Sequence, residues 1–399
     1  QLDINTSNVE KKAAIGNFLP IANANASHSW NIGLNQNITT GLLENQTTQF
    51  TSAGLNSSID IYNGLQNLNR LRRANLSRVS SQYQLDKMKD DVSLNVANAF
   101  LQILFNKENI KVQKEQMGFD EKQLIRTEEL VNVGTLPKGD LLDVKATIAS
   151  DKQRLVAAEN VLFLSKLSLS QLLQIEDFQN FDIIETQFNV SESPVSVQKP
   201  EAILAKAKEE RLDLKIAKAN LEIAERDVKI ARGAYQPSIS GFYSFSTRAS
   251  NSDTVSGYEL NTTNPTSIIG IVEGTGENVV RPNFLSVLGG PNSIFDQFSD
   301  NKGHSYGVQL NIPIFNGFVT KNNVTRSKIA LDRSRIAFQQ AELDLERNVY
   351  NAITDAKGAL NSYESAISAL DARKEAFNYA KERLAVGMMN TFEFNQAQT

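Results

Sequence analysis

The fold is decided by a short segment that occurs twice, as Ile59-Asp60-Ile61-Tyr62-Asn63-Gly64 and, 253 residues later (317 minus 64), as Ile312-Pro313-Ile314-Phe315-Asn316-Gly317. The same shift aligns residues 54–146 with residues 307–399 without a gap. A second anchor places an aromatic residue two positions before a proline, as Phe18 before Pro20 and Tyr235 before Pro237. The chain is therefore an internal duplication, and each copy is expected to build the same structural unit.

Four β-strands are predicted beside these anchors. Apolar and polar residues alternate from Ala22 to Asn35, and the same alternation precedes Tyr62, follows Pro237 and precedes Phe315. A period of two predicts strands with one apolar and one polar face. The polar faces consist mainly of Asn, Ser, Gln and Gly, which is typical of strands in membrane-spanning barrels. By this parity, Tyr62 and Phe315 are expected on the polar faces.

A very long helix is predicted after each Asn-Gly pair. About 70 residues without proline follow Gly64 and Gly317, which at 1.5 Å per residue would make helices roughly 100 Å long. Apolar residues recur every seven positions in both, at Val96, Ile103, Ile110, Met117, Leu124 and Val131, and at Val349, Ala356, Tyr363, Leu370, Phe377 and Leu384. A seam of this length indicates a left-handed coiled coil. Each helix is expected to end at a glycine, Gly134 or Gly387, where the chain turns back.

The composition argues against several classes of function. The 399 residues carry a net charge of −4 without a basic cluster, so nucleic acid is not an expected partner. There is no cysteine, and the two histidines, His28 and His304, lie on different predicted strands. A thiol site, a multi-histidine metal site and a catalytic triad are therefore not expected, and we predict neither an enzyme nor a cofactor. No run of eighteen or more apolar residues occurs, which argues against a membrane-spanning helix.

The order of these elements resembles that of the TolC-like outer membrane efflux proteins. The residues that carry the resemblance precede the odd strands, follow the even strands and form the two helix turns. They are Phe18-Leu19-Pro20 and Tyr235-Gln236-Pro237, then Tyr62-Asn63-Gly64 and Phe315-Asn316-Gly317, and finally Val133-Gly134-Thr135-Leu136-Pro137 and Val386-Gly387-Met388-Met389.

The resemblance implies a mixed α/β membrane duct built by a homotrimer. Each protomer would contribute four strands to a twelve-stranded β-barrel in the lipid of the bacterial outer membrane, continued through the periplasm by a long α-helical coiled-coil barrel. The implied function is the exit duct of a tripartite efflux or type I secretion-like system. It would pass drugs or polypeptides to the exterior from a periplasmic adaptor (a membrane fusion protein) and an inner-membrane pump. Independently, an open sheet edge cannot lie in lipid, so four strands require self-association.

The duplication divides the chain into seven segments. They are a truncated incoming helix (1–17), strands 1 and 2 (18–62), a long helix with its turn and returning helix (63–175), a side layer with strand-like pieces such as 181–184 (176–199), a further helix (200–234), strands 3 and 4 with a long external loop at 249–303 (235–315), and a second long helix with its turn and the start of a returning helix (316–399). Both outer ends are short against the internal repeat. We therefore expect a leader and further helix before Gln1 and a returning helix after Thr399.

Three groups of residues are candidates for functional roles. The adaptor-docking tips are Val133, Gly134, Thr135, Leu136, Pro137, Val386, Gly387, Met388 and Met389. The entrance constriction is assigned to Glu393, Gln396 and Asp140, where Gln396 replaces an acid common in the family and Asp140 has an alternative explanation as an acid favoured at a helix N-terminus. The barrel-to-helix transitions are assigned to Pro20, Asn63, Gly64, Pro237, Asn316 and Gly317.

Two other classes remain open at this point. A soluble coiled-coil scaffold or tether without a membrane barrel would explain the heptads, but it gives no reason for strands with uncharged polar faces. A diffusion porin would explain the strands, but it gives no reason for helices of roughly 100 Å.

Overall fold

The computed structural model describes residues 1–36, 41–184, 199–389, 393–394 and 397. The chain divides into two compact units. One unit, the sheet unit, comprises residues 2–78 and 222–333. The other, the helical unit, comprises Gln1 with residues 79–221 and 334–399.

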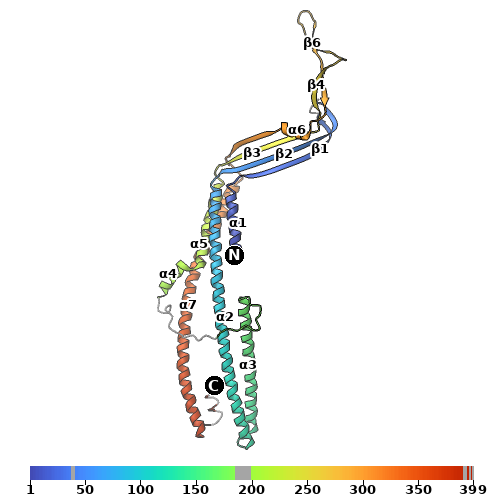
Figure 1. Cartoon of the computed structure of the whole chain (residues 1–399). Coiled ribbons are helices and arrows are strands. Elements are labelled where there is room, and N and C mark those ends of the chain that lie inside the picture. The colour runs from blue at the N-terminus through green and yellow to red at the C-terminus, as the bar shows by residue number, and fades with distance from the viewer. Residues whose placement is uncertain (37–40, 185–198, 390–392, 395–396, 398–399) are drawn as a thin grey trace. The chain divides into compact units, whose positions relative to one another are not determined.

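A four-stranded antiparallel sheet forms the main part of the sheet unit. Its strands are β1 (Ile21–Gln36), β2 (Leu43–Asn63), β3 (Ser238–Ser250) and β8 (Gly303–Asn311), hydrogen-bonded in the order β1-β2-β3-β8. The four predicted strands are thus confirmed, and β1 and β8 are the two edges of the sheet. Figure 1 shows β1, β2 and β3 running side by side.

The two faces of the sheet differ as the alternation predicts. Trp30, Ile32 and Leu34 of β1 share one face and are largely exposed in the single chain. The opposite face carries a network of uncharged polar side chains. Asn56 Nδ2 donates to Asn25 Oδ1 at 3.1 Å, and Ser244 Oγ donates to Asn56 Oδ1 at 2.7 Å. These hydrogen bonds therefore link β1, β2 and β3 across the polar face.

The predicted parity of Tyr62 is wrong because β2 contains a β-bulge. Asp60 pairs with Ser240, whereas Tyr62 pairs with Ile239, so one extra residue of β2 lies between these pairs. An extra residue exchanges the faces of all residues beyond it. Tyr62 therefore lies on the apolar face with Ile239, where its hydroxyl donates to Gln236 Oε1.

The segment 249–303, expected only as a loop, contains further short elements. Strand β4 (Thr254–Leu260) pairs with β7 (Phe284–Gly289), and β5 (Thr266–Ile271) pairs with β6 (Asn278–Pro282). Helix α6 (Ile294–Asp300) follows and is attached to the outer end of β3. Asn301 Nδ2 donates to Arg248 O at 2.8 Å, and Gln297 both donates to Ser250 O and accepts from Ser250 N.

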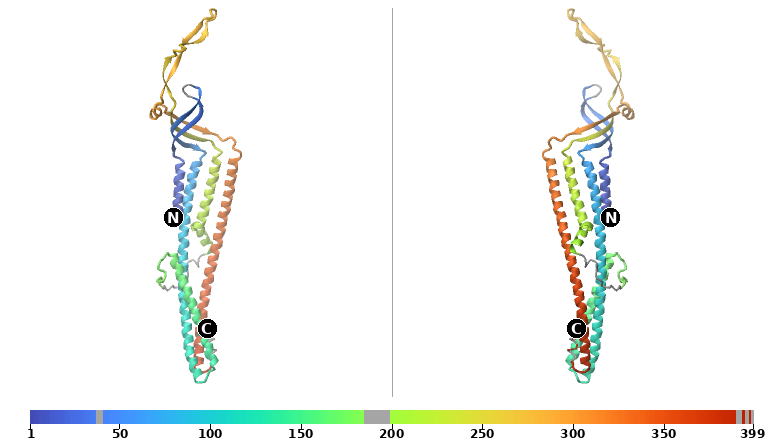
Figure 2. Two further views of the ribbon diagram at one scale, coloured as in Figure 1. Left: turned by 90° about the vertical axis from the view of Figure 1, so that its right-hand side faces the viewer. Right: turned by 90° about the vertical axis from the view of Figure 1, so that its left-hand side faces the viewer.

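Four helices join the sheet at one end. Helices α1 (Leu2–Gly16), α2 (Gln66–Asn132), α5 (Leu212–Gly233) and α7 (Val319–Ala385) adjoin β1, β2, β3 and β8 in the chain. Figure 2 shows them side by side in the order of those strands where they leave the sheet. Arg73 of α2 and Asp227 of α5 form an ion pair at 2.7 Å, which joins the second and third helices of this row.

In the helical unit, α2 packs against α3 (Lys138–Leu172). Ile110, Leu155 and Ala158 form a buried cluster with Met117 and Leu162 packed against it. Ile103, at the neighbouring heptad position, is completely buried. The heptad prediction is therefore confirmed for α2. On α7, Tyr363 and Leu370 are about half exposed in the single chain. No helix in the described part of the chain combines the length and the apolar character needed to cross a membrane.

Two expectations for the middle of the chain need correction. The helix expected at 200–234 is divided into α4 (Pro200–Glu210) and α5, because Arg211 has an extended backbone with φ −64° and ψ 127°. Residues 181–184 form no strand. Asp182 is held instead by Lys107 Nζ at 2.9 Å and Lys166 Nζ at 3.1 Å, which fastens this segment to α2 and α3.

Candidate functional site

The first tip is a tight turn between α2 and α3. Gly134 has φ +81°, a conformation that residues with a Cβ rarely adopt. The backbone N–H of Thr135 donates to Leu130 O at 3.0 Å, and the Thr135 hydroxyl donates to the same oxygen at 2.8 Å. This pattern closes the last turn of α2 at a left-handed glycine. Val133 is 71% exposed at the turn.

The second tip, after α7, repeats this backbone geometry. Gly387 has φ +74°, and Met388 N donates to Arg383 O at 2.8 Å. The donor and acceptor correspond to Thr135 and Leu130 at the repeat shift. Val386 and Met388 are 69% and 72% exposed, so both tips present apolar side chains to their surroundings.

The remaining tip residues differ in exposure. Leu136 and Met389 are half-buried, whereas Pro137 is exposed and precedes α3 as its N-cap residue. Asp140 lies in the first turn of α3 and is exposed, and its N–H donates to Pro137 O at 3.2 Å. This position fits the alternative explanation, an acid favoured by the helix dipole.

Of the other entrance residues, Glu393 is exposed on a short described helical stretch, whereas Gln396 lies outside the described residues. An aromatic row that the sequence reasoning missed adjoins Glu393. The ring centroid of Phe394 is 5.5 Å from that of Phe377, which in turn is 6.3 Å from that of Phe119. Phe377 and Phe394 are separated by a predicted turn, so only the folded chain shows that they meet.

At the first barrel-to-helix transition, two glycines are in close contact. Gly64 has φ +66°, and a Cβ added there would lie 2.1 Å from Gly233 O. The Asn63 side chain accepts from Asn67 N at 3.2 Å at the start of α2. The positive φ and the close contact require glycine at position 64, whereas Asn63 is one of several residue types that can accept this hydrogen bond. Pro20 and Pro237 directly precede β1 and β3.

The second transition has the same backbone conformation with different surroundings. Gly317 has φ +61°, but a Cβ added there would meet nothing within 4 Å. Asn316 donates to the Thr320 hydroxyl at the start of α7. The residues after the two glycines, Leu65 and Phe318, also have positive φ, at 59° and 64°. Sequence reasoning missed this strain because neither residue type favours that region.

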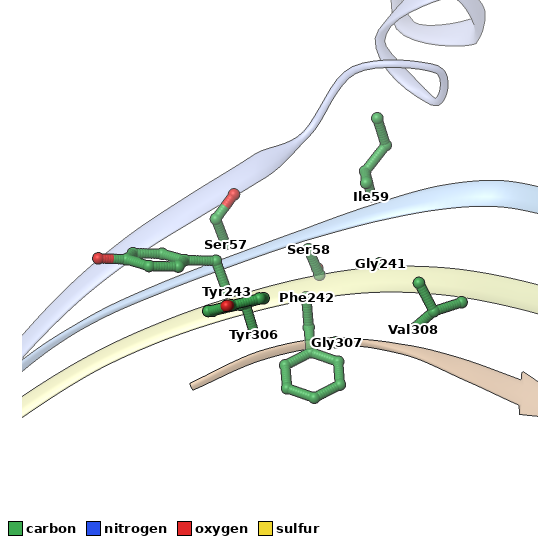
Figure 3. A pocket seen from close by; sticks show the side chains of 9 residues that line it. All are labelled: Ser57, Ser58, Ile59, Gly241, Phe242, Tyr243, Tyr306, Gly307 and Val308. Atoms are coloured by element: carbon green, nitrogen blue, oxygen red, sulfur yellow. The ribbon is translucent and has the colours of Figure 1, made fainter. Parts of the chain in front are cut away.

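The sheet has a shallow hollow of about 350 Å³ with an uncharged lining (Figure 3). It lies beside Gly241 and Gly307, and the ring of Phe242 lies against Gly307. A Cβ on Gly307 would be 3.0 Å from Phe242 Cζ, so the ring fills the space of the missing side chain. Among the described residues, no group of three or more His, Cys, Asp or Glu side chains that could hold a metal ion is found.

The chain shares its fold with solved bacterial outer-membrane channels. VceC of Vibrio cholerae superposes with a TM-score of 0.74 at 14% identity, covering 99% of this chain and 84% of that one. CmeC of Campylobacter jejuni gives 0.76 at 17% identity, covering 99% and 75%. MtrE of Neisseria gonorrhoeae gives 0.72 at 18% identity, covering 99% and 78%.

Sequence comparison leads to the same group of proteins. The outer membrane protein TolC of Vibrio cholerae is 22% identical over 357 residues, 87% of this chain and 70% of that protein. The model of the family described as outer membrane efflux protein matches residues 2–173 and 203–399. This match excludes the soluble scaffold and the plain porin as alternatives. The chain belongs to the outer membrane efflux protein family and is an outer-membrane efflux channel whose helical part lies in the periplasm.

Proposed function

We propose that this channel works as a homotrimer, the exit duct of a tripartite efflux or type I secretion-like system. The observation that carries the proposal is the sheet itself, which has four strands, two open edges and one exposed apolar face. Unpaired backbone groups at an edge cannot be left in lipid. Three such sheets would close a twelve-stranded barrel, a size within the range of known membrane barrels.

The two faces of the sheet give the orientation of the barrel. The face with Trp30, Ile32 and Leu34 would lie against the outer-membrane lipid. The polar face, with the linked side chains of Asn25, Asn56 and Ser244, would line the aqueous lumen. This lumen would be polar and mostly uncharged, with Glu44, Asp60 and Arg248 as the charged residues of the same face.

The two tips would dock on a periplasmic adaptor that is itself bound to an inner-membrane pump. Their backbone geometries are alike, and each exposes apolar side chains, Val133 at one and Val386 with Met388 at the other. Small exposed apolar groups on a rigid turn suit the helices of a partner protein. Glu393, with Gln396 and Asp140, would line the entrance beside these tips and favour cations.

The decisive experiment measures mass and conductance on one preparation. The purified chain in detergent is expected to have the mass of three protomers and to form conducting channels in planar bilayers. A monodisperse monomer, or a trimer without conductance, would contradict the proposal.

Charged substitutions at Val133 and Val386 are expected to abolish adaptor capture while leaving the trimer mass unchanged. A matched substitution at exposed Val161, on the α3 shaft away from the tip, serves as control.

A further inference from the structure

The internal repeat determines how one protomer would pair with the next. The repeat shift is 217 for β1 and β3 (237 minus 20) and 253 for β2 and β8. In the first copy, Ile21 pairs with Ser58. Adding the two shifts gives Ser238 and Asn311, which is the pair observed in the second copy. The two shifts therefore describe the three-dimensional structure as well as the sequence.

The two copies of the repeat are joined inside the chain by the pairing of two strands. The register of this internal pairing predicts the register between protomers. Strand β2 of the first copy pairs with β3 of the second, with Ser52 opposite Arg248 and Ala53 opposite Thr247. The equivalent join for β8 is to the β1 strand of another protomer. Applying the same shifts places Ser305 opposite Asn31 and Tyr306 opposite Trp30. Tyr306 and Trp30 are 81% and 60% exposed in the single chain, and both belong to the apolar face, so the parity of the two strands agrees.

The helices give an independent check on this register. Gly64 lies in close contact with Gly233 at the internal join. The equivalents of these residues are Gly317 and Gly16, and a Cβ on either would meet nothing within 4 Å in the single chain. Glycine at both positions has a packing reason only if they meet each other across two protomers. Gly317 needs glycine for its φ of +61° as well, but Gly16 has no such need.

Charge complementarity supports the same alignment. Arg73 and Asp227 form an ion pair inside the chain. At the repeat shifts, Arg73 corresponds to Arg326 and Asp227 corresponds to Glu10, so the equivalent pair is again a cation and an acid. Arg326 and Glu10 are both exposed in the single chain. Further along, Ser80 donates to Asn220 at 3.2 Å, and the equivalents of these two residues are Arg333 and Asp3. A polar pair inside the chain thus corresponds to opposite charges across the boundary.

We infer that β8 and α7 of one protomer join β1 and α1 of the next protomer in this single register. Tyr306 then lies opposite Trp30, Gly317 against Gly16, and Arg326 beside Glu10. The inference rests on the proposed homotrimer and adds the residue contacts of its three boundaries. The strand ladder extends from Gly303 opposite Gly33 to Asn311 opposite Asn25.

Disulfide cross-linking tests the register, because the chain contains no cysteine. Ser305→Cys with Asn31→Cys is expected to give covalent dimers and trimers under oxidation. The positive control is Ser52→Cys with Arg248→Cys, whose pairing inside the chain is observed and whose ladder position is equivalent. The slipped pair, Ser305→Cys with Ser29→Cys, is expected to cross-link at most weakly, since its Cα atoms are about two residues out of register.

The possible outcomes distinguish a failure of the proposed register from a failure of the proposed homotrimer. If the control pair forms its disulfide within a native trimer but Ser305 and Asn31 do not react, or the slipped pair reacts as well, the register is overturned. If the cysteine variants and the unaltered chain are all monomers, the proposed homotrimer fails instead.

A charge exchange provides a second readout. Arg326→Glu is expected to lower the trimer fraction several-fold at low salt, and adding Glu10→Arg to the same chain should restore it. Lys328→Glu, two residues away on α7, is the matched control and should have little effect. Failure of the double variant to recover trimer beyond Arg326→Glu alone would contradict the contact between Arg326 and Glu10.

Discussion

The carboxyl groups of Asp151 and Asp120 lie against each other between α3 and α2. The Asp151 side chain is only 3% exposed, and Arg154 pairs with its Oδ1 at 3.2 Å. Its Oδ2 has no hydrogen-bond partner among the described residues. Burial, followed by the neighbouring carboxyl of Asp120, raises the pKa of Asp151 above its usual value. Protonation of Asp151 would therefore turn one of its carboxyl oxygens into a donor toward Asp120.

Asp151→Asn is expected to stabilise the α2–α3 pair at neutral pH. Because the folded-state pKa is raised, folded protein binds the proton more tightly than unfolded protein does. The free energy of unfolding therefore falls as pH rises from the unfolded to the folded pKa. An amide can donate to Asp120 at any pH and would remove a cost of about 1–3 kcal/mol for an unsatisfied buried group. Melting temperatures at pH 4 and pH 8 test this, and the gain should be confined to pH 8. Asp140→Asn, exposed on the same helix, is the control and should give no such gain.

Asp182→Asn is expected to release the segment 176–184 from α2 and α3. Partial burial alone would raise the pKa of Asp182, but hydrogen bonds from Lys107, the Ile183 backbone and Lys166 together lower it to about 2. This depressed pKa contributes stability above the unfolded value near 4, and the contribution is lost as pH falls through about 2. Hydrogen exchange of 176–184 should become faster in the variant at pH 7. Asp177→Asn should leave this exchange slow, because among the described residues the Asp177 side chain bonds within the segment, to Asn180.

Glu393→Gln is expected to lower cation selectivity modestly and to weaken block by multivalent cations in planar bilayers. In a threefold assembly, three Glu393 carboxylates around one axis would attract cations to the entrance. Asp140→Asn should have a smaller effect, because Asp140 occupies the first turn of α3. Reversal potential across a salt gradient is the measurement. Unchanged reversal potential and unchanged divalent block in Glu393→Gln would remove Glu393 from the pore lining.

Gly64→Ala and Gly317→Ala are expected to separate protomer folding from assembly. Both glycines have positive φ, which costs an alanine about 1–2 kcal/mol. At Gly64 the added Cβ would also collide with Gly233 O at 2.1 Å, so the yield of folded protein should fall. At Gly317 the collision would arise only against Gly16 of the next protomer, so folded protein should accumulate with a reduced trimer fraction. Secondary structure by circular dichroism and mass in detergent measure the two effects, and equal folding losses would argue against the assignment.

Much of the fold follows from the sequence because it depends on local periodicity. The alternation around Trp30 and the heptads around Ile103 give the strands and helices directly. The β-bulge after Asp60 could not be predicted, because it depends on the register with β3 and changes no residue pattern within β2. The break at Arg211 could not be predicted either, since arginine is compatible with a helix interior.

In the candidate sites, too, features that depend on local sequence are predictable, whereas contacts that depend on tertiary packing are not. The turns at Gly134 and Gly387 are predictable, because a left-handed helix end selects glycine. The contact between Asp151 and Asp120 is not, because the residues lie 31 positions apart on two helices (151 minus 120). Nothing in either local sequence distinguishes these acids from the many exposed ones. The fastening of Asp182 by two lysines is likewise a product of tertiary packing.

Helix α6 affects how far another strand can add to the edge of the sheet before the chain assembles. Gln297 of α6 and its C-cap residue Asn301 bond to the backbone of Ser250 and Arg248, and they occupy the groups with which β3 would otherwise extend the sheet past Gly303. Strand addition at this edge is thereby limited to the nine residues of β8. A long unpaired edge invites indiscriminate pairing and aggregation. The short helix is therefore expected to reduce such pairing at the end of β3, beyond Gly303, in a chain that has not yet assembled.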